Sequence, residues 1–199
     1  MPEMFSEPEK LSKKDGQLLL TLARQSILHE LGNKDARIDQ LKLNASKTVL
    51  EENRGTFVTL HKKGELRGCI GNIHPEKTIF NGVADNARHA AFKDPRFRPM
   101  SYKEFEHTQI EVSILTCPEK LEYKNEQDLI SKLVPEVHGV IIEKGYHKAT
   151  FLPQVWHQLK TTDDFLSHLC SKAGLSSDDW KSCQLDIYTY QVQLFEEPG

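Results

Sequence analysis

Residues 56–71 read TFVTLHKKGELRGCIG and have the pattern of a β-hairpin. Residues 56–61 are rich in β-branched and aromatic side chains, which favour strands. Lys62, Lys63 and Gly64 supply a short turn, in which the glycine accepts a positive φ at little cost. Residues 65–70 then resume an extended pattern. The stretch therefore predicts two antiparallel strands joined by a tight turn.

The second strand of this hairpin carries the motif LRGCIG at residues 66–71. Side chains alternate across a strand, so its residues divide between two faces. We expect one face to belong to the core (Leu66, Gly68 and Ile70) and the other to point away from it (Glu65, Arg67 and Cys69).

Cys69 has surroundings that suit a reactive thiol. On a shared face, the Cα atoms of Arg67 and Cys69 lie about 7 Å apart, and a guanidinium at this distance favours the thiolate. Gly68 and Gly71 remove side chains beside the sulfur, which lets a ligand or another stretch of backbone come close. The alternative is a small buried cysteine between two packing glycines, because free cysteine is among the most buried residue types. Spacing alone gives the two interpretations equal weight.

Composition indicates a soluble globular protein. The chain has 199 residues, of which 38% are hydrophobic and 28% charged, and this length suits one domain or a domain with a small lobe. The net charge of −3 gives no electrostatic basis for general nucleic-acid binding. No apolar run is long enough to span a bilayer. Because residues 1–10 are polar and lack a signal-peptide core, we expect a cytoplasmic protein.

The cysteine and histidine spacing predicts no metal site and no cofactor. The four cysteines (Cys69, Cys117, Cys170 and Cys183) form no C-x-x-C pair, and no H-E-x-x-H motif occurs. Disulfides are not expected in a reducing compartment.

Helices and antiparallel hairpins alternate along the chain without a βαβ rhythm, which predicts an α+β fold with antiparallel sheets and packed helices. Helical patterns cover residues 12–31, 75–92, 101–104, 126–134, 153–159 and 163–173. Strand patterns cover residues 56–61, 65–70, 107–116, 140–143, 149–152 and 186–195. Residues 33–50 show no clear element.

Two strand positions outside the hairpin offer candidate site residues. Glu111 lies on the polar face of a strand whose other face is apolar, and a carboxylate there could accept a proton or orient an arginine. The simpler interpretation of Glu111 is a solvated sheet face. Thr150 lies where a strand end meets a helix start, and backbone N–H groups at such a junction can receive an oxyanion. Most such junctions have no such role.

The loop at residues 94–99, Asp-Pro-Arg-Phe-Arg-Pro, is stiffened by two prolines. Its Asp94 and Arg96, with Phe97 and Arg98 beside them, could shape a substrate site and hold an anionic group through an arginine fork. The alternative is that Asp94 and Arg96 pair with each other and brace the loop. A histidine could also serve Cys69 as a base, and the spacing does not choose among His74, His89 and His138.

Several motifs in order resemble one known family. They are LRGCIG at 66–71, AFKDPRFRP at 91–99, EVSIL at 111–115, ATFLPQVW at 149–156, FL at 165–166 and LCSKAGL at 169–175. Together they resemble the AMMECR domain family, also called AmmeMemoRadiSam system protein A, over about residues 12–195. The resemblance implies one α+β domain over residues 12–195, with two lobes around a cleft and the hallmark cysteine near it. Residues 1–11 would be a flexible extension.

The resemblance also implies association with a Memo-like protein and a radical-SAM protein, but supplies no established reaction. Our leading hypothesis is an enzyme that acts on an unknown small-molecule or protein substrate. Cys69, Arg67 and Glu111 would be its catalytic residues, and a second set would bind substrate (Gly68, Gly71, Asp94, Arg96, Phe97 and Thr150). The alternative is a non-catalytic binding, scaffold or regulatory protein in which LRGCIG is structural or part of an interface. Nucleic-acid binding ranks third.

Overall fold

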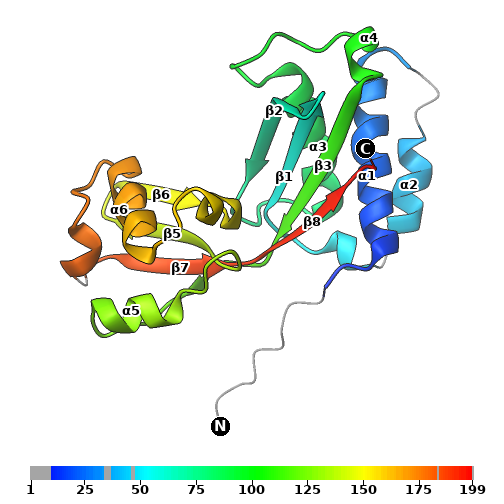
Figure 1. Ribbon diagram of the computed structural model, residues 1–199. Coiled ribbons are helices and arrows are strands. Elements are labelled where there is room, and N and C mark those ends of the chain that lie inside the picture. Colours follow the sequence, from blue (N-terminus) through cyan, green and yellow to red (C-terminus); the bar gives the residue numbers. More distant parts are fainter. Residues whose placement is uncertain (1–9, 34–36, 46–47, 183, 199) are drawn as a thin grey trace. The chain divides into compact units, whose positions relative to one another are not determined.

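The computed structural model describes residues 10–33, 37–45, 48–182 and 184–198 (Figure 1). The chain forms two compact units. The first consists of residues up to Leu115 together with those from Gln193 onward, and the second of Thr116–Val192. The second unit is thus an insertion into the first.

The first unit contains a four-stranded sheet with the order β2-β1-β3-β8. Its strands are β1 (Thr56–Lys62), β2 (Glu65–Asn72), β3 (Thr108–Leu115) and β8 (Val192–Glu196). β1 pairs antiparallel with both β2 and β3. The predicted hairpin is therefore confirmed, and its first strand lies in the interior of the sheet.

The helices of the first unit are α1 (Lys13–Glu30), α2 (Ile38–Ala45), α3 (Ile79–Phe92) and α4 (Tyr102–Phe105), with a 3₁₀ turn η1 at Val49–Glu51. α1 begins after Ser12, which forms a capping box with Asp15. Residues of α1 and α3 share one apolar core with Val58, Leu60 and Ile110 of the sheet. One face of the sheet is therefore the core face.

The second unit contains a sheet with the order β4-β7-β5-β6. Its strands are β4 (Glu119–Lys120), β5 (Gly139–Lys144), β6 (His147–Phe151) and β7 (Asp186–Tyr190). Its helices are α5 (Glu126–Lys132) and α6 (Thr162–Lys172), with 3₁₀ turns η2 (Pro153–His157) and η3 (Asp179–Ser182). In its core, Trp156 stacks on Phe165 with ring centroids 3.7 Å apart, and Trp156 Nε1 donates to the His138 carbonyl at 2.8 Å.

The α+β prediction is confirmed, but four local predictions need correction. The single strand expected at residues 186–195 is two strands, β7 and β8, which belong to different sheets. Residues 33–50 contain α2 and η1, where no element was expected, and residues 153–157 form a 3₁₀ turn in place of a longer helix. α3 begins at Ile79 because the Thr78 side chain accepts from the Asn81 N–H, so residues 75–78 precede the helix.

The predicted N-terminal extension lies mostly outside the described residues. Of residues 1–11, the structure describes the last two, and Leu11 is held through two hydrogen bonds between its backbone and the Gln193 side chain. Among the described helices, none has the length and apolar character that a membrane crossing requires.

Candidate functional site

A β-bulge at Arg67 interrupts the hairpin. β1 pairs Leu60 with Gly68 but His61 with Leu66, so Arg67 is an extra residue on β2. The expected alternation is confirmed for Gly68, Cys69 and Ile70, which lie opposite Leu60, Thr59 and Val58, but it is wrong for residues 65–67. Leu66 was assigned to the core, yet it is 43% exposed.

The bulge decides on which face Cys69 lies. Counting back from the pair of Lys62 and Glu65 without a bulge would place Cys69 opposite Val58, which is fully buried in the core. With the bulge, Cys69 lies opposite Thr59, on the face away from α1 and α3. The thiol is half-buried. The extra residue thus turns the sulfur out of the core.

Cys69, Thr59 and Glu111 form one row across three strands. Thr59 of β1 lies opposite Cys69 of β2 on one side and opposite Glu111 of β3 on the other. Its Oγ1 is 3.4 Å from the Cys69 Sγ, and its side chain also hydrogen bonds to Glu111. The Cys69 N–H points to the sheet edge, so Thr59 and Cys69 form a non-hydrogen-bonded pair, in which facing side chains are closest. A hydroxyl therefore bridges thiol and carboxylate.

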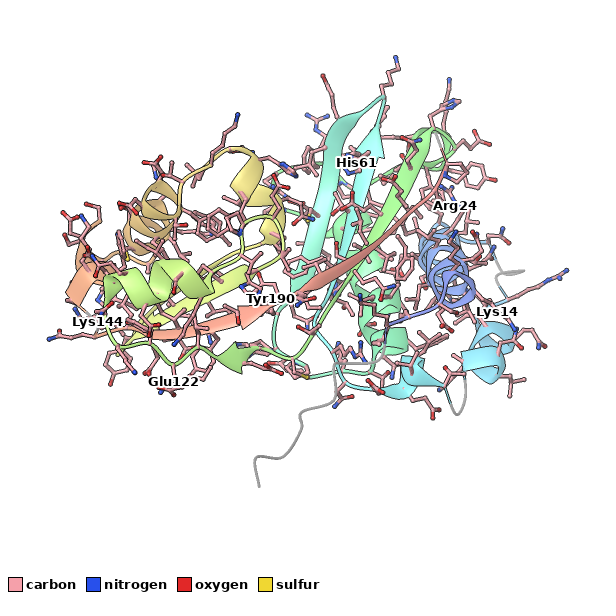
Figure 2. The ribbon with its side chains drawn as sticks, turned by 60° about the horizontal axis from the view of Figure 1, so that its bottom comes forward. Lys14, Arg24, His61, Glu122, Lys144 and Tyr190 are labelled. Carbon is pink, nitrogen blue, oxygen red and sulfur yellow. The ribbon has the colours of Figure 1, made fainter. Side chains whose placement is uncertain are left out.

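Glu111 is a carboxylate that the fold makes costly to ionise. Its side chain is 22% exposed. Burial, reinforced by the nearby charge of Glu196, raises its pKa, whereas His61 and the Thr59 hydrogen bond oppose that shift. His61 Nε2 lies 3.7 Å from the Glu111 carboxylate, and Figure 2 labels His61 on the sheet of the first unit. A carboxylate with a raised pKa is a better proton acceptor near neutral pH.

Asp94 and Arg96 bind the backbone of Cys69 at the open edge of β2. The buried Asp94 carboxylate accepts the Cys69 N–H at 2.8 Å, and Arg96 Nη2 donates to the Cys69 carbonyl at 3.3 Å. Asp94 also receives Arg96 Nε at 3.0 Å and Nη2 at 2.7 Å. These Arg96 hydrogen bonds, followed by the backbone N–H groups of Cys69 and Arg96, hold the pKa of Asp94 well below its ordinary value despite burial. The loop replaces the missing strand partner along this part of the edge.

Arg67 does not face the thiol, so the prediction that it shares a face with Cys69 is wrong. Its Nε donates to Glu104 Oε1 at 2.9 Å, and its Nη2 donates to the Arg98 carbonyl at 2.7 Å. Lys62, which alternates on the core side with Leu60, also reaches Glu104. Arg67 is 9% exposed, and its buried Nη1 has no partner in the described part of the chain. We assign Arg67 to a structural ion pair.

The two glycines of the motif are occupied by packing. A Cβ on Gly68 would lie 2.3 Å from the Ala90 carbonyl oxygen of α3, and a Cβ on Gly71 would lie 2.2 Å from the Phe57 ring. These glycines were expected to let either a ligand or other protein atoms come close, and in the structure it is other protein atoms that do so.

The remaining predicted site residues make other contacts. The Phe97 ring is contacted by two guanidinium groups, of Arg67 at 5.4 Å and of Arg96 at 5.5 Å. Thr150 belongs to the second unit, where its hydroxyl donates to the Val140 carbonyl at 2.9 Å and lies 3.0 Å from the Tyr190 hydroxyl. These partners satisfy Thr150 within its own sheet.

The described residues contain no cluster of three or more His, Cys, Asp or Glu side chains arranged to hold a metal ion. Cys117 is exposed and Cys170 is buried, whereas Cys183 lies outside the described residues.

A family model described as AMMECR1 matches residues 20–195. The chain belongs to the AMMECR1 family. The resemblance inferred from LRGCIG and the later motifs is thus confirmed, and the matched region includes the whole row of Cys69, Thr59 and Glu111.

Relatives of this AMMECR1-family chain match along nearly their whole length. The protein MK0488 of Methanopyrus kandleri is 41% identical, with 95% of this chain and 91% of that protein covered. A protein of Methanothermobacter thermautotrophicus is 38% identical, with 95% and 97% covered. The crystal structure of the uncharacterized protein PH0010 from Pyrococcus horikoshii is similar with a TM-score of 0.79 and 32% identity, over 95% of this chain and 94% of that one. These names state no reaction.

Proposed function

We propose that this AMMECR1-family protein is an enzyme whose nucleophile is the Cys69 thiol and whose proton acceptor is Glu111. The observation that carries the proposal is the row in which the Thr59 hydroxyl lies between the sulfur and the carboxylate. Nucleophilic catalysis uses a nucleophile with a base within reach of its proton, and here the Thr59 hydroxyl lies between the two.

The Thr59 hydroxyl has one proton, so the row has two consistent states. In the first, the Cys69 S–H donates to Thr59 and Thr59 donates to ionised Glu111. In the second, Thr59 donates to the thiolate and accepts from protonated Glu111. Passing between them moves one proton from sulfur to the hydroxyl and one from the hydroxyl to Glu111, which leaves the sulfur free to attack an electrophilic carbon. The raised pKa of Glu111 favours this transfer.

Alkylation kinetics test the proposal. We expect iodoacetamide to alkylate Cys69 nearly as fast at pH 7 as at pH 9, and Glu111→Gln to lower the pH 7 rate about tenfold while leaving the pH 9 rate nearly unchanged. Thr59→Val should have a similar effect because it removes the bridging hydroxyl, whereas Thr59→Ser should retain the wild-type profile. Peptide mass spectrometry reports each cysteine separately.

The exposed Cys117 provides an internal reference in the same digest. Its pH dependence should be the same in all variants. Comparing pH 7 with pH 9 at one cysteine also cancels the slower access expected of a half-buried sulfur. A Cys69 profile that matches that of Cys117 in the wild-type protein would refute the nucleophile proposal.

The burial of Glu111 is expected to lower the free energy of unfolding at neutral pH. Because the folded state holds its proton up to a higher pH than the unfolded chain, ionisation of Glu111 lowers the free energy of unfolding as the pH rises above about 4.5, its ordinary value. We expect Glu111→Gln to be more stable than wild type at pH 7, with the difference vanishing near pH 4. Urea denaturation at both pH values measures it, and a Glu111→Gln protein less stable at pH 7 would contradict the assignment.

A non-catalytic binding protein is the second candidate, and the packing of Gly68 and Gly71 favours it to the extent that LRGCIG is structural. Under this candidate, the chain would dock a Memo-like or radical-SAM protein in the cytoplasm. Under this candidate Cys69→Ser should keep both partner binding and cellular function, whereas the enzyme proposal expects cellular function to be lost. A pull-down that recovers no such partner would count against the binding candidate.

A further inference from the structure

Arg96 is a cationic side chain that hydrogen bonds to the backbone of Cys69. Its Nη2 donates to the carbonyl of the same residue that carries the sulfur, at 3.3 Å. Its pKa is raised first by the hydrogen bond to Asp94 and also by the negative charge of an ionised Cys69 thiol. Arg96 of the 94–99 loop, and not Arg67, is therefore the arginine whose guanidinium contacts Cys69.

The contacts of Arg96 occupy only part of its guanidinium. Nε and Nη2 donate to Asp94, and Nη2 also donates to Cys69. Nη1 makes no hydrogen bond to any residue that the structure describes, and the side chain is 53% exposed. An arginine carries five N–H donors in a planar arrangement, so the two on Nη1 remain available to solvent or to a ligand.

The hydrogen bonds to Asp94 also hold the Arg96 guanidinium in one orientation. The Asp94 carboxylate binds Arg96 through both of its oxygens and is itself 2% exposed. A guanidinium held in one orientation loses less conformational entropy when it binds an anion. A brace between Asp94 and Arg96 alone would not need the contact with the Cys69 carbonyl.

We infer that Arg96 binds an anionic oxygen group of the substrate, a carboxylate or a phosphate, beside the Cys69 sulfur. This inference rests on the proposed role of Cys69 and adds to it the chemical class of the substrate: a small electrophile that carries a carboxylate or phosphate. Planar N–H pairs of arginine match the oxygens of both groups.

Two alkylating reagents of similar size separate anion recognition from thiol reactivity. Iodoacetate is anionic and iodoacetamide is neutral, and both transfer their methylene carbon to the thiolate with loss of iodide. We expect the ratio of the iodoacetate rate to the iodoacetamide rate to be at least about fivefold higher at Cys69 than at Cys117. Added sodium chloride should reduce that excess by screening. Equal ratios at the two cysteines would overturn the inference even if Cys69 is highly reactive.

Matched variants locate the effect. Arg96→Gln should bring the Cys69 ratio down to that of Cys117, whereas Arg98→Gln, an identical charge change in the same loop, should leave it unchanged. A urea transition on each variant shows whether it is folded. If Arg96→Gln is unfolded, the wild-type ratio and the Arg98→Gln control still decide, and loss of the preference in Arg98→Gln would contradict the assignment to Arg96.

A binding measurement keeps the inference independent of the thiol. In the folded wild-type protein, titration with sodium acetate or inorganic phosphate at constant ionic strength should shift the NMR resonance of the Arg96 side-chain Nε–H but not that of Arg98. A stronger response to acetate would identify a carboxylate substrate, and a stronger response to phosphate a phosphorylated one. No response to either anion overturns the inference, whereas a response with an unreactive Cys69 overturns only the nucleophile proposal.

Discussion

Replacing Glu104 with alanine is expected to lower the free energy of unfolding at pH 7 by about 2–3 kcal/mol. Glu104 binds Arg67 through both carboxylate oxygens, at 2.9 and 3.1 Å, and Arg67 is 9% exposed. Removing one partner of a buried pair leaves the other charge uncompensated, at a cost of about 3–5 kcal/mol. We discount that range because the Glu104 side chain is 22% exposed. Chemical denaturation measures the difference.

The pH dependence identifies the cause of this loss. The hydrogen bond from Arg67, aided by Lys62 and opposed by burial, lowers the pKa of Glu104 to about 2 from an ordinary 4.5. Its stabilisation is therefore complete above pH 4.5 and disappears as the pH falls toward 2. The gap between wild type and Glu104→Ala should narrow steadily from pH 5 to pH 3. The exposed Glu106 gives the control, since Glu106→Ala should change stability little; a gap that stays constant with pH would rule out the ion pair as its origin.

Gly68→Ala should destabilise the protein by about 1–3 kcal/mol or more. The added Cβ would lie 2.3 Å from the backbone oxygen of Ala90, so β2 and α3 must move apart, and overpacking of this kind costs that much. Thermal unfolding should show a lower midpoint. Cys69→Ala, at the adjacent position, adds no volume and should cost much less.

Comparison with Gly16 shows why a second substitution should not restore the stability lost in Gly68→Ala. The Cβ of Gly16→Ala would meet the side-chain ring of Phe195, so Phe195→Leu should restore much of the lost stability. The obstacle at Gly68 is backbone, which no side-chain truncation removes. Recovery of Gly68→Ala stability by shortening a neighbouring side chain would show that the close approach of α3 is not the reason for this glycine.

Local patterns predicted the elements that local interactions determine. The start of α1 follows from Ser12 and Asp15, which cap the helix within four residues of sequence. The end of the same helix follows from Gly32, whose φ of 94° few other residues adopt. Residues 186–195 were harder, because their continuous strand pattern does not reveal that Gln191 separates strands of two sheets.

The candidate site depends on how β1 and β2 pair, which the alternation of side chains along a single strand does not reveal. Alternation placed Glu111 correctly on the face away from the apolar residues of β3, because that strand is regular. It failed at Arg67, where one extra residue breaks the alternation, so that Leu66 does not share the core face of Gly68 and Ile70. Thr59 was missed because alternation within one strand does not show which residue of the neighbouring strand lies opposite Cys69. The available signal was its alternation with the apolar residues of β1, which places Thr59 on the polar face.

The second unit is inserted between two strands of the first unit that lie side by side in its sheet. The chain leaves the first unit after Leu115 of β3 and returns at Gln193 of β8, and these two strands are neighbours in one sheet. At the base of the excursion, the Thr116 N–H donates to the Gln191 carbonyl at 3.0 Å, and the Gln191 N–H donates to the Thr116 hydroxyl at 2.9 Å. A short turn could therefore replace all 77 residues from Thr116 to Val192 without changing the strand order. Cys69, Thr59 and Glu111 all belong to the first unit. The second unit can therefore be exchanged for another segment without substituting any of these three residues.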